Sequence, residues 1–278
     1  MASNKASSGP CPLQWASVSD IGRVRQENQD ACYADAESGL FLTCDGMGGH
    51  QAGAMASKIV TEIMPEMIRR RLHRLGAARA RAIRYWLRSD ILDLSKRLRA
   101  ESAAQAELAG MGTTLVMVLL REDRAHIASM GDSRAYLFRD GQLTQLTEDH
   151  SLVGLLLRSG EITPEEAKDH PARGQLTRYI GMKDEVYPDV RTVDLAEGDR
   201  LLLCSDGLTG VISDQTIAEI LKAQDDSQAA CQTLVDAANA AGGPDNVTVV
   251  IVDWQGCADQ IVPICESRRS GTQGPRSR

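Results

Sequence analysis

The chain has 278 residues, of which 42% are hydrophobic, and its formal net charge is -7 at pH 7. This length and composition suit one large domain or two small ones, and they exclude a disordered or fibrous protein. The negative charge argues against a general nucleic-acid or membrane-surface binder, because such proteins need a basic surface to displace counterions.

No stretch approaches the roughly 18 uninterrupted apolar residues of a membrane span, and the segment Met1 to Pro10 lacks the apolar core of a secretory signal. Seven cysteines occur without a Cys-x-x-Cys pair, which favours reduced thiols over disulfides or a zinc site. We therefore expect a monomeric cytoplasmic protein that neither inserts into membranes nor binds nucleic acid.

Residues 1–12 are rich in Ser, Ala, Gly and Pro, which predicts a flexible segment ahead of the domain. A strand is expected from Trp15 to Ile21. The polar stretch from Gly22 to Asp30 follows, and it contains Arg25. An arginine in a turn is usually a solvated charge, but a planar guanidinium is also well suited to hold a phosphate through two hydrogen bonds.

An apolar strand from Phe41 to Cys44 ends in Asp45-Gly46. Asp-Gly is also the commonest hairpin turn, and we expect such a turn at Asp140-Gly141, where strand-like runs flank the pair closely. After Asp45 the chain instead continues through further glycines into a helix from Ala52. The Asp45 carboxylate is thus free for a chemical role.

Residues 52–110 have a helical pattern interrupted near Pro65 and Gly76, which predicts two long helices. From Arg69 to Arg99 the segment is rich in Lys and Arg, and its only acids are Asp90 and Asp93. Such a basic stretch is ordinarily a solvated helix surface, and docking of an acidic partner is the alternative.

A strand pair is expected from Leu115 to Leu120 and from Ala125 to Met130, and its second strand runs into Gly131-Asp132. His126 lies inside that strand and is interpreted as a structural histidine. Residues 151–181 then depart from the strand pattern. They include a short helix that begins after Thr163, which makes the segment a candidate lid.

The strand from Leu201 to Cys204 repeats the arrangement at Asp45, because it leads into Asp206-Gly207 with no partner strand after it. The remaining predicted elements are a helix capped by Ser213 or Asp214, a helix from Ser227 to Ala241, a tight loop that carries Asp245, a closing strand from Val247 to Val252, and a flexible tail over residues 255–278.

Four acids share one placement, at the beginning or end of a predicted strand and beside a glycine or in a glycine-bearing loop: Asp45, Asp132, Asp206 and Asp245. Strand ends that share an edge would bring them together. Clustered carboxylates repel one another unless a cation compensates them. Oxygen ligands select Mg²⁺ or Mn²⁺, so the hypothesis is a two-metal centre.

The chain resembles the protein phosphatase 2C family of metal-dependent serine/threonine phosphatases, in its bacterial form, from about Trp15 to Trp254. The resemblance rests on six motifs in this order: Asp20-x-Gly22-x-x-Arg25-x-x-Asn28-Gln29-Asp30, Asp45-Gly46-Met47-Gly48-Gly49-His50, Gly112-Thr113-Thr114, Gly131-Asp132-Ser133-Arg134, Ser205-Asp206-Gly207-Leu208 and Asp245-Asn246. It implies one catalytic domain over residues 13–254 in the α+β class, a four-layer αββα sandwich. Residues 152–178 match a variable flap.

The resemblance also implies roles for single residues. Asp45 would bridge two Mn²⁺ or Mg²⁺ ions, with the Gly46 carbonyl on the second ion. Asp206 and Asp245 would hold the first ion. Two further acids complete the set, Asp30 acting through a bound water and Asp132 holding a weaker third ion. Arg25 would receive the substrate phosphate.

The implied reaction is hydrolysis of phosphoserine or phosphothreonine in proteins by a metal-activated water, opposing a bacterial serine/threonine kinase. His50 is the candidate acid for the leaving alkoxide. The chain departs from the family pattern at Gln29, where many members have Glu, and at Met47, where other members have the histidine. Weaker binding of the second metal is expected. The alternative function is a non-catalytic phosphoprotein-binding module on the same fold.

Overall fold

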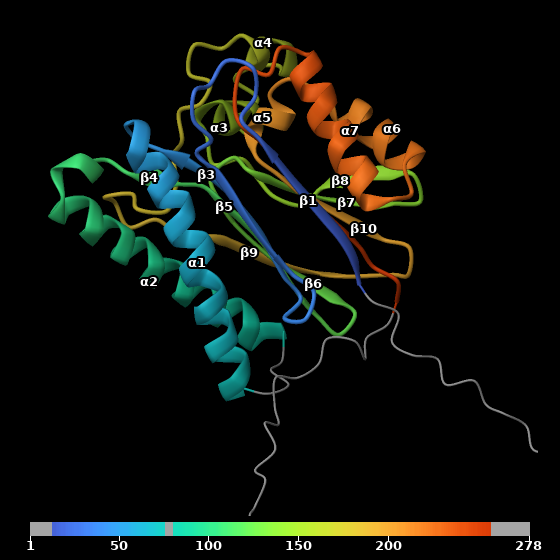
Figure 1. Cartoon of the computed structure of the whole chain (residues 1–278), viewed down its shortest axis with the longest axis horizontal. Coiled ribbons are helices and arrows are strands. Elements are labelled where there is room, and N and C mark those ends of the chain that lie inside the picture. Colours follow the sequence, from blue (N-terminus) through green and yellow to red (C-terminus); the bar gives the residue numbers. More distant parts are fainter. Residues whose placement is uncertain (1–12, 76–79, 257–278) are drawn as a thin grey trace, which may run out of the picture.

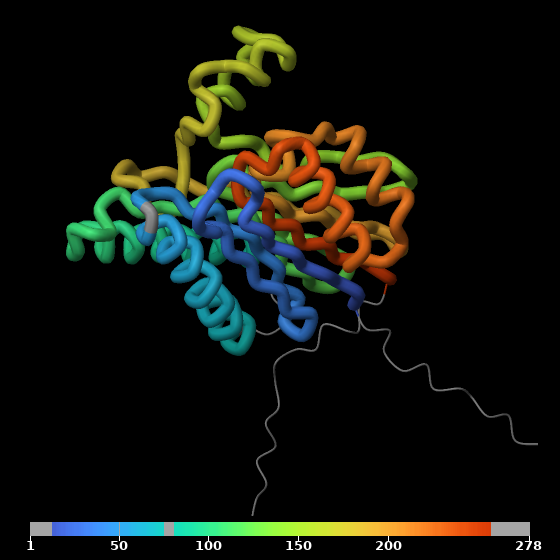
Figure 2. The backbone as a smooth tube through the Cα atoms, turned by 45° about the horizontal axis from the view of Figure 1, so that its top comes forward, coloured from blue at the N-terminus to red at the C-terminus, as the bar shows by residue number. Residues whose placement is uncertain are grey.

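The computed structural model describes residues 13–75 and 80–256. The flexible segment predicted at residues 1–12, most of the predicted tail and Gly76 lie outside the described residues. Figures 1 and 2 show two packed sheets with helices on both outer sides. This is the αββα sandwich of the α+β class that the sequence predicts.

The first sheet has five strands, and every strand pair in it is antiparallel. Their order is β1 (Gln14–Asp20), β11 (Val247–Asp253), β10 (Arg200–Cys204), β7 (Arg134–Arg139) and β8 (Gln142–Gln145). The predicted hairpin joins β7 to β8. Asp140 and Gly141 both have positive φ there, 51° and 77°, as the tightest hairpin turns require.

The second sheet is also antiparallel and follows the order β2 (Asp30–Asp35), β3 (Leu40–Met47), β5 (Leu115–Arg121), β6 (Arg124–Met130) and β9 (Asp189–Asp194), with β4 (Gly112–Thr113) beside the end of β3. β5 and β6 form the predicted strand pair. His126 is buried in β6, and its Nδ1 lies 2.9 Å from the Thr192 hydroxyl. It is a structural histidine, as predicted.

The helices cover the two outer faces of the sandwich. They are α1 (His50–Leu75) and α2 (Ala80–Ala104) on the second sheet, α6 (Asp214–Ala223) and α7 (Ser227–Ala240) on the first, and the short α3 (Leu152–Ser159), α4 (Pro164–Lys168) and α5 (Asp206–Thr209) near one end. A single 3-10 turn, η1 (Ala106–Leu108), follows α2.

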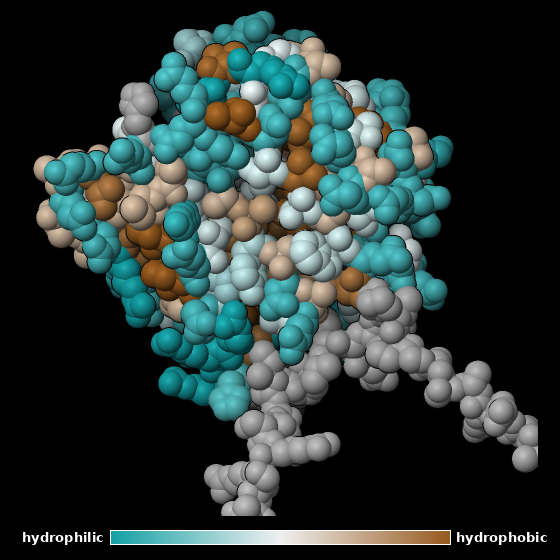
Figure 3. Space-filling model, viewed as in Figure 1, coloured by the Kyte–Doolittle hydropathy of each residue, from teal (hydrophilic) through white to brown (hydrophobic). Residues whose placement is uncertain are grey.

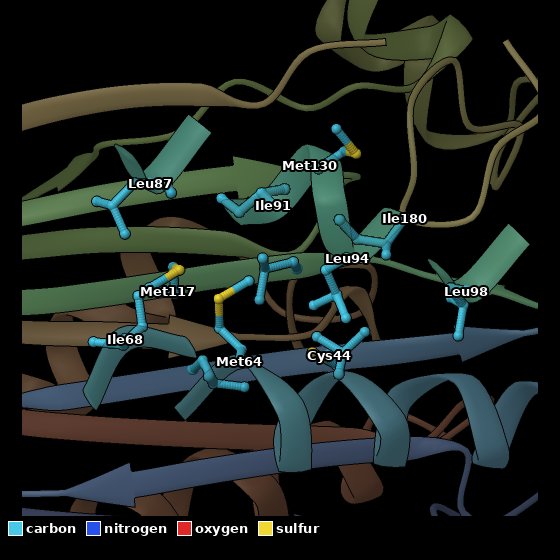
Figure 4. Close-up of a cluster of buried hydrophobic side chains, with 14 of the residues drawn as sticks. Cys44, Met64, Ile68, Leu87, Ile91, Leu94, Leu98, Met117, Met130 and Ile180 are labelled. Carbon is cyan, nitrogen blue, oxygen red and sulfur yellow. The ribbon is translucent and has the colours of Figure 1, made fainter. Parts of the chain in front are cut away.

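Apolar side chains fill three layers, one between the sheets and one under each helix pair. Strand β3 shows why its apolar run is continuous: Leu40 and Leu42 pack against α1 and α2, while Phe41 packs between the sheets. A strand buried on both faces needs apolar residues at successive positions. Figure 4 shows the layer beneath α1 and α2, where Met64 and Leu94 meet side chains of the sheet.

The expected break of the first long helix at Pro65 is wrong. Helix α1 continues through Pro65 without interruption. Proline removes one backbone donor from a helix, at a cost of about 3 kcal/mol. Here Met64 and Ile68, on the turns around it, are fully buried in the core. Tertiary packing on this face therefore outweighs the local helix-breaking tendency.

Most of the cationic side chains between Arg69 and Arg99 are solvent-exposed, as predicted for a solvated helix surface. Figure 3 shows a hydrophilic surface over the lower ends of α1 and α2. Arg71 is an exception. It donates three hydrogen bonds of 2.8 to 3.1 Å to Asp90, which is 2% exposed. This ion pair joins α1 to α2 and gives the basic segment a structural role.

Replacing Arg71 with Leu should destabilise the domain by about 3 kcal/mol, because it leaves a buried carboxylate without its partner. The matched control is Arg70→Leu, since Arg70 is exposed and lies 3.8 Å from Glu66; it should cost less than about 1 kcal/mol. Urea unfolding measures both. The double variant Arg71→Leu/Asp90→Leu should recover much of the loss, and an equal cost for Arg70 and Arg71 would contradict the buried-pair interpretation.

Candidate active site

Both sheets contribute acids to one end of the sandwich. Strands β2 and β3 place Asp30 directly opposite Asp45. Asp206 begins α5 two residues after the end of β10, and Asp245 lies two residues before β11. Asp132 follows β6 in the turn before β7. The structure brings the five predicted acids into one cluster, in which neighbouring acids contribute to the pKa shifts of Asp30, Asp45, Asp132 and Asp206.

Burial and mutual repulsion raise the pKa of four of these carboxyls. Burial raises the pKa of Asp30 to about 7, with a further contribution from Asp206 and Asp245. It raises the pKa of Asp132 to about 8, helped by Asp206 and Asp149. The pKa values of Asp45 and Asp206 are also raised, first by burial and then by neighbouring acids. The cluster therefore favours bound protons or cations.

Glycines allow the backbone to pass close to these acids. A Cβ on Gly46 would lie 2.0 Å from the Gly53 carbonyl oxygen, where α1 begins, and a Cβ on Gly207 would lie 1.9 Å from the Asn246 carbonyl oxygen. No larger residue fits either position without moving backbone. The Asp-Gly pairs thus combine a carboxylate with close approach of a second segment.

Thr114 holds the strand end that carries Asp45. Its hydroxyl accepts a hydrogen bond of 2.8 Å from the Asp45 amide, and its own amide donates to the Asp45 carbonyl. The same hydroxyl lies 2.7 Å from that of Ser133, next to Asp132. Thr114 of the motif Gly112-Thr113-Thr114 therefore fixes the backbone of Asp45 and contacts the residue that follows Asp132.

Asn246 holds the loop that carries Arg25. Its side-chain oxygen accepts from the Gln29 amide at 2.8 Å, and its side-chain nitrogen donates to the carbonyls of Ile21 and Glu27. The Arg25 guanidinium then reaches Asp245, with 2.7 Å between Nη2 and Oδ2. The sequence motif contained Asn246, but only the fold reveals this role, because its three partners are more than 200 positions away.

The clustered acids offer oxygen ligands for a divalent cation. Among the described residues, no three acidic, histidine or cysteine side chains already converge as a complete ligand shell. Asp245 is turned toward Arg25, and Asp206 shares a hydrogen bond with Asp45. However, Oδ1 of Asp30 and Oδ1 of Asp206 are buried without a hydrogen-bond partner. Buried carboxylate oxygens of this kind fit a hard cation.

His50 is the first residue of α1, but its side chain lies outside the described residues. Its role as an acid therefore stays a prediction.

Comparison with known proteins settles the family. Residues 22–246 match the family described as Protein phosphatase 2C. The chain belongs to the protein phosphatase 2C family. It is therefore an enzyme domain of the phosphatase class, and its antiparallel sandwich is the architecture of that family.

Named relatives share most of this phosphatase domain. A serine/threonine phosphatase stp of Listeria monocytogenes is 38% identical over 237 residues, which cover 84% of this chain and 93% of the relative. The serine/threonine protein phosphatase PstP of Mycobacterium tuberculosis is 40% identical over 246 residues, covering 87% of this chain and 45% of PstP.

Solved structures of phosphatases have the same fold. The catalytic domain of PstP in complex with 2 manganese ions aligns with a TM-score of 0.76 and 37% identity, over 87% of this chain and 97% of that one. Serine/threonine phosphatase Stp1 from Staphylococcus aureus aligns with a TM-score of 0.79 and 35% identity, over 92% of this chain and 100% of that one.

In this phosphatase domain the flap, residues 152–178, stands out from the sandwich (Figure 2). It contains α3 and α4, and Thr163 caps α4 in a reciprocal capping box with Glu166. The two ends of the flap are joined by backbone hydrogen bonds, from Leu152 to the Gln175 carbonyl and from Thr177 to the His150 carbonyl. The two ends of the flap therefore lie side by side where the flap joins the sandwich.

His150 fastens this base to the acid cluster, and no sequence signal pointed to it. It is 1% exposed, its Nδ1 accepts a 3.2 Å hydrogen bond from the Gly131 amide, and its Nε2 donates to Asp189 at 2.9 Å. Arg178, at the far end of the flap, also donates to Asp189. Burial lowers the pKa of His150, which favours the neutral ring that this geometry needs.

Replacing His150 with Gln should loosen the flap base, because the Gly131 amide loses its acceptor. The matched control is His126→Gln, which removes an equally buried histidine bonded to Thr192. Both variants should lose about 1 to 3 kcal/mol of stability. Only His150→Gln should speed amide exchange in residues 150–152 and 175–177, measured by hydrogen–deuterium exchange. Equal rates of amide exchange at these residues in both variants would contradict the prediction that His150 stabilises the base of the flap.

The raised carboxyl pKa values also predict a pH dependence. Asp30 and Asp132, with pKa values of about 7 and about 8, bind protons more tightly in the folded protein than when unfolded, where the pKa is about 3.9. In EDTA, stability should therefore fall as pH rises from about 4 to about 8, by on the order of 1 kcal/mol per pH unit. Thermal unfolding across pH measures it, and Asp132→Asn should flatten the slope. Stability that is constant or increases from pH 5 to 8 would contradict the prediction.

Proposed function

We propose that this domain hydrolyses phosphoserine and phosphothreonine in proteins at a centre of two divalent ions, Mn²⁺ or Mg²⁺, and opposes a bacterial serine/threonine kinase. The observation that supports it most is the cluster of mutually repelling carboxylates with unpartnered buried oxygens, placed beside an arginine. Two-metal sites use carboxylates in this way to stabilise an in-line displacement at phosphorus. The manganese ions of the related PstP structure supply independent support.

The proposed ligands are the residues expected from the sequence. Asp45 would bridge the two ions, with the Gly46 carbonyl on one, while Asp206 and Asp245 would hold the other. Asp30, fixed by a 2.7 Å hydrogen bond from the Ser205 hydroxyl, would act through water. Asp132 would hold a weaker third ion. When bound, the ions would activate water as the nucleophile and neutralise charge on the phosphoryl group.

Arg25 is proposed to bind the phosphoryl oxygens. Its side chain is 51% exposed, and its bond to Asp245 uses the Nη2 nitrogen, so further guanidinium donors remain for a phosphoryl group. Binding of the Asp245 carboxylate to a cation would release Arg25 for the substrate. Arginine suits this task because its fork matches two phosphate oxygens. His50 is proposed to protonate the leaving alkoxide.

We propose that the substrates are phosphorylated proteins and that a serine/threonine kinase is the opposing enzyme. Gln29 would weaken binding of the second ion. The described cysteines Cys32, Cys44, Cys204 and Cys231 are free thiols, as in a reducing compartment. We propose a cytoplasmic monomer. None of the helices in residues 13–75 and 80–256 has the length and apolarity needed to cross a membrane.

Purified protein should hydrolyse a small aryl phosphate and a phosphothreonine peptide with Mn²⁺ and lose this activity in EDTA. Asp206→Asn should lower kcat/KM at least about 100-fold, since even partners of metal ligands contribute 10- to 100-fold. Asp236→Asn is the control, because Asp236 is an exposed acid of α7 whose side chain accepts from Gln232. A folded wild type that binds Mn²⁺ without any turnover would instead favour the non-catalytic phosphoprotein-binding module.

A further inference from the structure

Helix α2 exposes a row of cations that the proposed function does not use. Arg81, Arg84, Arg88 and Lys96 are exposed, and their spacings of three, four and eight positions place them on one face of the helix. We call these four residues the basic row. At a rise of 1.5 Å per residue, the row is about 22 Å long. It belongs to a chain whose net charge is -7, so its positive charge is a local feature.

The cations of the basic row lack acidic partners in the described part of the chain. None of the ion pairs formed within residues 13–75 and 80–256 includes a residue of the row. Arg71 of α1, by contrast, is paired with Asp90. Like charges three or four positions apart destabilise a helix slightly. Stabilisation of α2 therefore does not explain why these cations gather on one face.

An aromatic side chain stands among the arginines of the row. Tyr85 is 79% exposed, and it lies four positions after Arg81 and three before Arg88, so one helix face carries all three side chains. Arginine and tyrosine are enriched where proteins bind one another, whereas lysine is depleted there. Three of the four cations in the row are arginines. This composition is typical of a protein-binding surface.

The basic row is separate from the clustered acids. The pKa of His126 is lowered to about 4, first by burial and then by nearby arginines that include Arg84. Arg84 therefore lies near His126, close to the start of β6, and Asp132 follows the other end of the same strand. Six residues of a strand span about 20 Å. A partner on the row would thus contact a surface distinct from the acid cluster.

We propose that the basic row is a docking surface for an acidic segment of a partner protein, with an apolar side chain of that segment placed against Tyr85. Charge complementarity sets the sign of the partner. The length of the row corresponds to about seven residues of extended chain at 3.3 Å each. The inference does not depend on the proposed function, because no residue of the row belongs to the proposed metal centre.

A short protein segment fits the row better than a nucleic acid or a membrane does. Nucleic acids and anionic membranes present extended negative surfaces. Glu62 and Glu66 of α1 and Asp93 of α2 are exposed on the same helix pair, and they would repel such a surface. Tyr85 is also the only exposed large apolar side chain described in α2, which is too little apolar surface for insertion into a membrane.

The test measures binding of fluorescein-labelled peptides by fluorescence anisotropy, in EDTA and at about 50 mM salt, because higher salt screens surface charge. One probe is a peptide of eight glutamates, and the other has Phe at its fourth position. Wild-type protein should bind both, and the Phe peptide more tightly.

The double variant Arg84→Glu/Arg88→Glu should weaken binding of both peptides at least about tenfold, since one exposed ion pair contributes up to about fivefold in affinity and the reversed charges add repulsion. The matched control is Lys58→Glu/Lys222→Glu, which changes the net charge equally at exposed lysines of α1 and α6. It should weaken binding less than about threefold, because only long-range charge changes there.

Tyr85→Ala tests the apolar contact. It should remove most of the advantage of the Phe peptide over the all-glutamate peptide, whereas Tyr187→Ala, at a tyrosine that is 55% exposed outside the row, should leave that advantage unchanged. Peptide length tests the size of the surface. Affinity should rise from four glutamates to eight and then change little from eight to twelve, because about seven extended residues cover the row.

Equal weakening by the two double variants would overturn the proposal, as would a wild type that binds neither peptide. Tighter binding of an octathymidylate than of the peptides would contradict it in favour of a nucleic acid. Binding to vesicles of phosphatidylserine and phosphatidylcholine without binding to the peptides would contradict it in favour of a membrane. A dimer in sedimentation that Arg84→Glu/Arg88→Glu dissociates would assign the row to a second copy of the chain instead.

Hydrolysis of the aryl phosphate with Mn²⁺ reports separately on the proposed function. Arg84→Glu/Arg88→Glu should keep this activity within about twofold of wild type, because the row is about 20 Å from the acids along β6. A wild type without this activity would contradict the proposed function and leave the peptide result unaffected. Thermal unfolding verifies that all variants are folded.

Discussion

Electrostatic repulsion among carboxylates is the constraint on which the active end of this molecule depends. Asp30 and Asp45 lie opposite each other on adjacent strands of one sheet, and Asp206 and Asp245 belong to the other sheet. Packing of the two sheets holds these acids together, although burial and then the repulsion of neighbouring acids raise the pKa of Asp45 and Asp206. The apolar layer between the sheets therefore stabilises an arrangement that the acids by themselves would disperse.

Neutral polar side chains keep this arrangement rigid. Thr114 binds the backbone of Asp45 in both directions, and Ser205 donates to Asp30. Asn246 ties the loop of Arg25 to the segment of Asp245. Hydrogen bonds between buried groups are costly to lose, so the positions of the acids are set by partners that carry no charge. Preorganised oxygens of this kind suit a centre in which metal ions supply the chemistry.

The acid cluster and the flap adjoin each other at one end of the sandwich. The sandwich carries the acids, and residues of the flap line a common groove with Asp132 and Asp206. His150 and Arg178 fasten the two ends of the flap to Asp189 at the start of β9, and Arg173 ties the flap to Gly210. The flap is therefore attached to the sandwich at its base and through Arg173, by side chains other than those of the clustered acids.

The sequence by itself determined the local features. Asp45 and Asp206 follow apolar strands, Thr163 caps a helix, and Asp140 makes a turn, because each depends on neighbouring residues. The helix break predicted at Pro65 was wrong, because packing of the helix against the core outweighs the local tendency of proline to end a helix. Only the tertiary structure decided that His150 holds the flap, that Asn246 orders the Arg25 loop, and that Arg71 neutralises a buried Asp90. These contacts join residues far apart in the chain, and their free energy arises from burial and geometry that no local pattern encodes.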